Sequence, residues 1–466
     1  MGVITMSTSP HVIIIGAGTG GLCLAQGLKQ AGVKVTVSER DRTRRDGLQG
    51  YRVGISPDGS RALHACLPPE LWDVFVATCA RKPFYFGMWS EQLRELLVFG
   101  PELTEGQQPP EPDPIAQDRS VSRMTLRQVL LTGLEDVVQF DKTFTHYEQR
   151  PDGTVTAFFD DGTSATGDVL VAADGSNSRV RGQYLPDAKL VDAKLIGLVG
   201  KTPLTEETRK LLPDKVFNGI SIVSGPGGYS TIIHVMEFPW GQDGKPKDTI
   251  GGTNSELIES WPGLLYDNTR DYIMWSFGSA QHKMPADLMG LKGPQLRELV
   301  IERTTRWHPN LRKLFLLGDT STIFPINIRT SEPIPQWKTT TITLLGDAIH
   351  TMTPGRGIGA NTALRDARLL CENLVKAREG GMTLLDAIHD YETQMVEYGF
   401  DAVIKSRSAG TGDDAVYKPV IGPIVAMIGR TGMRLVNNLP RQMKMKIAEN
   451  MDKDRDQEKQ KKQATA

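Results

Sequence analysis

Three glycines near the N-terminus have the spacing that lets a backbone hold a nucleotide phosphate. Gly16, Gly18 and Gly21 form a G-x-G-x-x-G pattern between an apolar run at residues 12–15 and a helical stretch at residues 22–30. The first glycine permits a tight turn, the second lets the backbone approach a pyrophosphate, and the third allows close packing of helix on strand. The first amides of the helix and its dipole then face the phosphates. The pattern therefore predicts a dinucleotide site.

An acidic residue stands where such a site usually meets a ribose. A second apolar run, residues 33–37, ends just before Glu39, which lies 18 residues after Gly21. The usual separation is roughly 20 residues, and the carboxylate accepts the ribose 2′-OH. FAD and NAD have this hydroxyl whereas NADP carries a phosphate there, so Glu39 favours FAD or NAD. We assign its neighbour Arg40 to the same cofactor site.

Two later segments repeat the combination of a buried strand and a polar or glycine-rich turn. The apolar run at residues 169–173 ends in Asp174-Gly175. The run at residues 343–345 ends in Gly346-Asp347 and leads through a Pro-Gly-Arg-Gly-Ile-Gly-Ala-Asn loop, residues 354–361, into a helix. We expect both segments to complete the nucleotide site that the first glycines begin.

The three motifs, in this order and at this spacing, resemble those of the class A flavoprotein monooxygenases, the para-hydroxybenzoate hydroxylase-like family. Residues 121–130 are also similar to that family's R-x-x-L-x-x-x-L helix, in which the first arginine, here Arg123, touches FAD. Asp366 stands where the family has an acidic helix residue after its G-x-G-x-N pattern. The resemblance covers nearly the whole chain and fits both salicylate hydroxylase-like and tetracycline monooxygenase-like members.

The resemblance implies an enzyme that binds FAD without a covalent link and reduces it with NADH or NADPH. The reduced flavin would react with dioxygen to give a C4a-hydroperoxide, which hydroxylates or epoxidises an aromatic or polycyclic small molecule. The protein would supply orientation, electrostatics and exclusion of water. The alternatives are a flavin-dependent halogenase, a flavin-dependent reductase and a flavin-binding protein without catalysis. The W-x-W-x-I-P signature of the halogenases is absent from the sequence.

The resemblance also assigns roles to individual residues. The amides of residues 357–361 are expected at the edge of the flavin ring, where glycine avoids a Cβ clash and a helix N-terminus stabilises negative charge. We therefore expect Pro354 and Gly357 in the catalytic site. The other predicted cofactor contacts are Gly54, Arg123, Asp174, Asp347, Gly359, Ala360 and Asn361.

Some of these residues also have an ordinary structural explanation, which the sequence leaves open. Asp174 can be a turn former at the end of a strand, and Asp347 can cap a helix. Arg123 can be a solvated helix residue. For His350, which lies inside the Gly-Asp motif, a structural hydrogen bond is preferred over a role as a base.

The substrate site is the least defined part of the prediction. Arg52 and Tyr51 follow the ribose strand in a segment that passes close to the flavin in the resembling family. Arg52 is predicted to be catalytic, although a surface strand residue fits equally well. Five side chains are candidate walls for a planar apolar substrate, and each of them is more often simple core: His234, Met236, Trp275, Phe277 and Phe324.

The order of elements predicts an α/β fold with two lobes, because 466 residues exceed the usual size of one hydrophobic core. Residues 10–188 and 341–385 are expected to form a discontinuous Rossmann-like FAD-binding domain of the glutathione-reductase type. Residues 189–340 are expected to form an inserted mixed or antiparallel β-sheet substrate domain. Residues 386–450 are expected to be helical, and residues 451–466 to be a disordered tail.

Composition excludes several other classes of protein. A net charge of −1 gives no electrostatic case for nucleic acid, and the four cysteines are scattered without the spacing of a metal site. No secretory signal is evident, so a cytoplasmic location is expected. Residues 420–428 are apolar and are followed by cations. A helix packed on the body is preferred there over a monotopic membrane anchor. A proline-rich surface loop is expected at residues 101–118.

Overall fold

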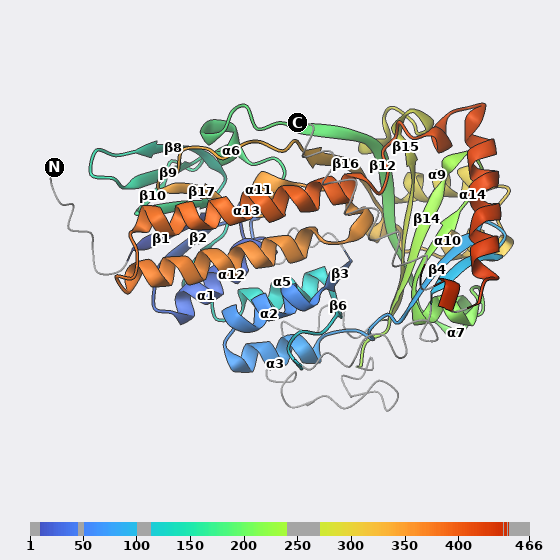
Figure 1. Cartoon of the computed structure of the whole chain (residues 1–466), viewed down its shortest axis with the longest axis horizontal. Coiled ribbons are helices and arrows are strands. Elements are labelled where there is room, and N and C mark those ends of the chain that lie inside the picture. The colour runs from blue at the N-terminus through green and yellow to red at the C-terminus, as the bar shows by residue number, and fades with distance from the viewer. Residues whose placement is uncertain are drawn as a thin grey trace.

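The computed structural model describes residues 10–44, 51–99, 113–239 and 271–440, together with 442–444 and 446. Most of the predicted proline-rich loop, residues 101–112, and the predicted tail at residues 451–466 lie outside this description. The described chain forms two lobes that lie side by side (Figure 1). One lobe is built on a parallel sheet and the other on a larger, mostly antiparallel sheet.

The first lobe takes its elements from both halves of the chain. They are β1 (His11–Ile15), α1 (Thr19–Gln30), β2 (Lys34–Ser38), β3 (Arg52–Ile55), α2 (Pro57–Cys66), α3 (Pro69–Ala77), β6 (Arg119–Ser122), α5 (Arg123–Leu131), β7 (Val138–Gln139), β8 (Phe144–Gln149), β9 (Val155–Phe159), β10 (Ser164–Gly167), β11 (Val169–Ala172), α6 (Arg179–Tyr184), β17 (Ile342–Leu344), α11 (Asp347–His350), α12 (Gly359–Arg378) and α13 (Leu384–Arg407).

The second lobe is dominated by long strands. Its elements are β4 (Tyr85–Ser90), β5 (Glu95–Phe99), β12 (Leu190–Pro203), α7 (Glu206–Arg209), β13 (Gly219–Ser224), β14 (Ser230–Met236), β15 (Tyr272–Ala280), α9 (Gly293–Arg303), α10 (Pro309–Leu316), β16 (Phe324–Ser331) and α14 (Ile421–Asn437).

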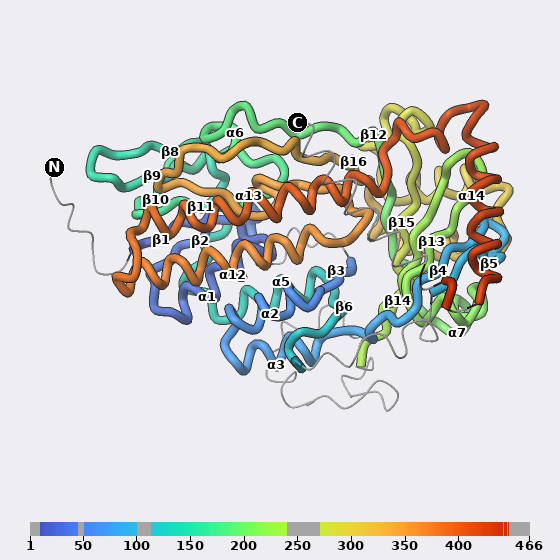
Figure 2. Tube along the Cα trace, in the orientation of Figure 1, coloured from blue at the N-terminus to red at the C-terminus, as the bar shows by residue number. Residues whose placement is uncertain are grey.

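The parallel sheet of the first lobe has the strand order β17-β11-β1-β2-β7. β1 lies at its centre, so that Ile14 is paired with Val37 on one side and Val171 on the other. Strands that are covered on both faces have continuous apolar sequences, which explains the runs in β1 and β11. Figure 2 shows α12, from the C-terminal part of the chain, between the N-terminal α1 and α13. This arrangement is the predicted Rossmann-like fold.

The larger sheet has seven strands in the order β16-β12-β15-β14-β13-β4-β5. Side chains on each strand alternate between its two faces. Trp275 and Phe277 point to the face covered by α9 and α10, where they pack in the core of this lobe and do not line a pocket. His234 and Met236 lie on the other face. Residues 85–99 add two strands to a sheet that we expected residues 189–340 to supply.

The C-terminal helices lie on different lobes. α13 runs along the first lobe, where Tyr391 donates a hydrogen bond to the Leu344 carbonyl at 2.8 Å. α14 lies at the outer edge of the second lobe (Figure 1). Within the described ranges, no helix combines the length and the apolar character that crossing a bilayer requires.

Candidate functional site

The glycine-rich turn joins β1 to α1 at the carboxyl edge of the parallel sheet. A Cβ on Gly16 would lie 2.4 Å from the Ala173 carbonyl oxygen, and one on Gly21 would lie 2.3 Å from the Gly16 carbonyl oxygen. Gly16 and Gly21 must therefore be glycines, because backbone atoms fill the space that a Cβ atom would take. Gly18, by contrast, is exposed and has nothing within 4 Å of its Cβ position. The turn leaves open space beside its second glycine, as a pyrophosphate site requires.

Glu39 lies directly beside this turn. Its Oε2 accepts a hydrogen bond from the Ala17 amide at 2.6 Å, and its Oε1 accepts one from the Asp41 amide at 3.0 Å. The side chain is buried, so both bonds hold the carboxylate in one orientation. Each carboxylate oxygen can accept a further hydrogen bond, which leaves capacity for a ribose hydroxyl. Arg40, the neighbouring residue, is exposed.

A second arginine of α5 lies at this turn although the sequence analysis did not select it. Arg127 is buried, donates from Nε to the Ala17 carbonyl at 3.2 Å and forms an ion pair with Asp41 at 2.9 Å. Arg123 is exposed at the start of α5, and its amide donates to the Tyr51 carbonyl. Residues four apart lie on one face of a helix. That spacing is the sequence signal that could have identified Arg127.

The Asp174 loop follows β11 at the same edge. Asp174 Oδ2 accepts from the Arg179 amide at 2.9 Å, whereas Oδ1 is buried and has no hydrogen-bond partner among the described residues. Burial raises the pKa of this carboxyl. Arg181 donates to the Ser176 and Ala348 carbonyls, each at 2.8 Å, and so fixes the Asp174 loop to the Gly-Asp motif. A buried acceptor without a donor fits a ligand hydroxyl.

The Gly-Asp motif is organised by Asp366 of α12, which is completely buried. Its carboxylate accepts from the Gly346 amide at 2.8 Å and the Tyr398 hydroxyl at 2.6 Å, and it lies 2.7 Å from His350 Nε2. Burial alone would lower the pKa of His350, but the charge and hydrogen bond of Asp366, together with the Asp347 charge, outweigh it and the pKa is raised. His350 thus has the structural hydrogen bond that the sequence favours.

Asp347 itself points into the space between these loops. Its side chain is open to solvent but is surrounded by protein on most sides, and this desolvation raises the pKa of its carboxyl. The charges of His350 and Arg123 oppose this increase in the pKa of Asp347. Arg123 therefore lies near Asp347, although it belongs to a different element. The structure therefore brings two of the predicted cofactor residues, Asp347 and Arg123, near each other.

The loop at residues 354–361 leads from the Gly-Asp motif into α12. Pro354 is exposed, and Gly357 has a φ of +63° with nothing within 4 Å of its Cβ position. α12 then begins at Gly359 without a side-chain cap, so its first amides face the opening. Asn361 accepts from the Ser56 amide and donates to the Gly54 carbonyl, each at 2.8 Å. Gly359 and Ala360 are half-buried between these points.

Asn361 thereby attaches β3, and with it Arg52, to the start of α12. Arg52 Nε donates to Ser120 Oγ at 2.7 Å, and this hydroxyl lies 3.4 Å from His234 Nε2 on β14. Burial lowers the pKa of Arg52 to about 10, and burial together with the Arg52 charge lowers that of His234. Within the described ranges Arg52 has no ion pair. A desolvated cation beside a neutral histidine is suited to bind an electron-rich group.

Aromatic side chains surround this polar pair. Lys201 Nζ lies 4.9 Å from the centre of the Tyr51 ring and 4.4 Å from that of Tyr272. The Phe324 ring is 5.7 Å from Tyr51, and Met236 lies in the same cluster. Of the predicted pocket walls, His234, Met236 and Phe324 are therefore brought together. The sequence analysis missed Lys201 and Tyr272, although strand alternation places them on this face.

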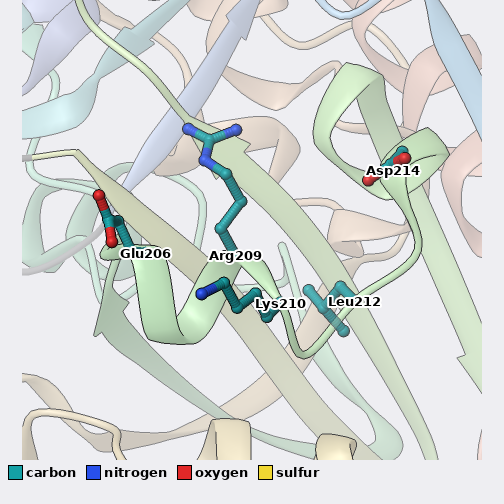
Figure 3. A pocket seen from close by; sticks show the side chains of 5 residues that line it. All are labelled: Glu206, Arg209, Lys210, Leu212 and Asp214. Carbon is teal, nitrogen blue, oxygen red and sulfur yellow. The ribbon is translucent and has the colours of Figure 1, made fainter.

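A separate surface recess of about 420 Å³ lies in the second lobe beside α7 (Figure 3). Its lining contains none of the predicted site residues: Glu206, Arg209, Lys210, Leu212 and Asp214. We assign it no role in the site.

Comparisons with known proteins identify the family. The family model described as FAD binding domain matches residues 9–55 and 306–401. A protein of Photorhabdus luminescens assigned as an FAD-containing monooxygenase is 35% identical, with a TM-score of 0.72 over 86% of this chain and 98% of that chain. The chain belongs to the class A FAD-dependent monooxygenases. The predicted family, fold class and FAD cofactor are confirmed.

Two further relatives show the range of this monooxygenase family. The FAD-dependent urate hydroxylase of Klebsiella pneumoniae is 26% identical over 85% of this chain and 91% of the relative. The dual O-methyltransferase/FAD-dependent monooxygenase CTB3 of Cercospora beticola is 32% identical over 83% of this chain but only 44% of the relative. The chain thus spans less than half the length of the dual enzymes that it matches.

Proposed function

We propose that this monooxygenase uses NADH or NADPH, FAD and dioxygen to add one oxygen atom to a planar aromatic or polycyclic small molecule. The observation that carries the proposal is the Asn361 bridge, which places the Arg52–His234 pair beside the uncapped start of α12. The loop that would hold the cofactor and the polar pair with its aromatic neighbours therefore lie next to each other. The urate hydroxylase relative supports a nitrogen-containing ring as substrate class.

The residues around the cleft fit FAD. The open space at Gly18 and the uncapped start of α1 would receive the pyrophosphate. Glu39 would accept the adenosine ribose hydroxyl, and the orphaned Asp174 Oδ1 would accept a hydroxyl of the ribityl chain. The loop at residues 354–361 would hold the flavin ring. When bound, FAD supplies the reduction by pyridine nucleotide and the activation of dioxygen.

The chain's own residues would orient the substrate and exclude water. Amides at the start of α12 face the position where negative charge develops, and a helix N-terminus stabilises such charge. Arg52, with the buried neutral His234 behind it, would bind the polar edge of the substrate, while the partly buried Phe324 covers an apolar face. Water would be excluded because the side chains on this side of the proposed site, Phe324 and Met236, are apolar.

The test is a turnover experiment with purified protein loaded with FAD. Phenols, aminobenzoates and polycyclic phenols would be added singly with NADH or NADPH while flavin absorbance and oxygen uptake are followed. We expect flavin reduction to accelerate when a substrate is present and the product to gain one oxygen atom by mass spectrometry. A product that gains halogen only when halide is added, or a protein that releases no FAD on denaturation, would contradict the proposal.

A further inference from the structure

α14 is attached to the second lobe by polar side chains. The Arg430 guanidinium lies 2.7 Å from Glu91 Oε2 and donates to the Ser224 carbonyl at 2.7 Å. Two turns later, Asn437 Nδ2 donates to Glu95 Oε1 at 3.0 Å. Residues seven apart lie on one side of a helix. The side of α14 that faces the protein is therefore its polar side.

The apolar residues of α14 point away from the protein. Ile421, Ile424, Ile428 and Leu435 follow the spacing of one helix face and are 49%, 51%, 63% and 65% exposed. The sequence favoured packing of this apolar run on the body of the protein. The helix does lie on the protein, but the expectation is wrong about which face does so, because the apolar stripe points away. Contiguous exposed apolar surface of this kind marks an interaction site.

The charged residues of the segment that carries this stripe, residues 415–448, are all cationic. No acidic residue occurs between Asp414 and Glu449. Lys418, Arg434 and Lys446 are exposed along the same segment. A second copy of α14 would bring these cations against like charges. Residues 451–466 are nearly all charged or polar, so their composition does not suit them to cover an apolar stripe.

We propose that α14 docks this protein on an anionic bilayer surface, with Ile421, Ile424, Ile428 and Leu435 inserted among the lipid headgroups. An amphipathic helix with an apolar face and only cationic flanks binds in this way, lying in the plane of the interface. At 17 residues, α14 is about 25 Å long and would lie along the surface. The polar contacts of Arg430 and Asn437 would keep the helix on the protein while its outer face is in the lipid.

Flotation with vesicles tests this proposal on the full chain loaded with FAD. We expect wild-type protein to float with phosphatidylcholine–phosphatidylserine vesicles and to remain in solution with phosphatidylcholine alone. The double variant Ile424→Glu/Ile428→Glu should bind at least about tenfold more weakly, because two half-exposed isoleucines no longer contribute apolar burial. Its FAD content and thermal midpoint should match those of the wild type, since both side chains are more than half exposed.

The matched control is Leu316→Glu/Met289→Glu, which changes two side chains of similar exposure, 55% and 53%, on other elements. It should float like the wild type. Equal loss in the control, equal binding to both vesicle types, or no flotation of wild type would overturn the proposal. The proposal would also be overturned if light scattering showed that the wild type is a dimer and that the Ile424→Glu/Ile428→Glu variant is a monomer. The stripe would then be an interface between two copies of the chain.

Discussion

At the scale of single residues, Asp366 has the largest structural influence on the cofactor edge. It is fully buried and holds the Gly346 amide, His350 and the Tyr398 hydroxyl at once. Asp366→Asn should cost about 2–4 kcal/mol of stability and weaken FAD binding at least tenfold, because a buried charge network loses its acceptor. Urea unfolding and FAD titration measure the two effects.

Tyr398→Phe provides the control for Asp366, because it removes one of the same hydrogen bonds and leaves the charge. It should cost about 1 kcal/mol and change FAD affinity little. Equal FAD loss in both variants would show that the tyrosine contact, and not the carboxylate, sets the position of Gly346.

Arg52 gives the second prediction at this scale. Its guanidinium is desolvated, bonds Ser120 and has no carboxylate partner within the described ranges. Arg52→Met should lower kcat/KM for an electron-rich substrate about ten- to hundredfold, the value of a charge-assisted hydrogen bond. FAD content should stay unchanged, as absorbance would show, and Arg52→Lys should recover part of the loss. Unchanged turnover in Arg52→Met would remove Arg52 from the substrate site.

At the scale of elements, the loop before α12 can be separated from the helix that follows it. Gly357 and Gly380 lie at opposite ends of α12, have φ angles of +63° and +79°, and have open space at their Cβ positions. Gly357→Ala and Gly380→Ala should each cost about 1 kcal/mol through left-handed backbone strain. Only Gly357→Ala should impair FAD binding or flavin reduction. Normal turnover in Gly357→Ala would place the flavin ring elsewhere.

The contact of α13 with the first lobe predicts a pH dependence. Glu392 is buried, and burial raises the pKa of its carboxyl to about 7, against hydrogen bonds from Thr339 and Trp337. A carboxyl whose pKa is raised in the folded state stabilises that state fully when the pH is below its unfolded-state pKa of roughly 4–5. This stabilisation is lost as the pH rises through the folded-state pKa of about 7. Glu392→Gln should therefore gain about 1–2 kcal/mol relative to wild type at pH 8 and nothing at pH 4.5. Urea unfolding midpoints of both proteins at pH 8 and at pH 4.5 measure this difference in stability. An equal effect of the substitution at the two pH values would contradict a raised pKa of Glu392.

The residues of the proposed site that the sequence could suggest are those whose signals are local. Gly16, Glu39, Asp174 and Asp347 each follow a buried apolar strand, so strand and turn can be recognised together. The pairing of β4 with β13 joins residues more than a hundred positions apart and has no local signal. The sequence could not predict which face of α14 contacts the protein either. An amphipathic pattern shows that a helix has a polar and an apolar face, but not which of the two packs on the body.

At the scale of the whole molecule, the proposed substrate site belongs to neither lobe alone. Arg52 and Ser120 come from the first lobe, and His234, Lys201 and Tyr272 come from the larger sheet. Ligand sites commonly form where two such units meet. Changes in substrate preference should therefore follow substitutions on the His234 face of the sheet and leave the cofactor edge intact.

The distant origin of β17 has a consequence for biosynthesis. β1 ends at Ile15, whereas β17 begins at Ile342, and both belong to the same parallel sheet. A ribosome adds about 5–20 residues per second, so on the order of tens of seconds separate the synthesis of β1 from that of β17, the last strand of this sheet, and of α12. Nascent chains that stop before α12 should contain the glycine-rich turn but lack the loop that we propose holds the flavin ring. Cofactor capture should therefore follow the synthesis of α12.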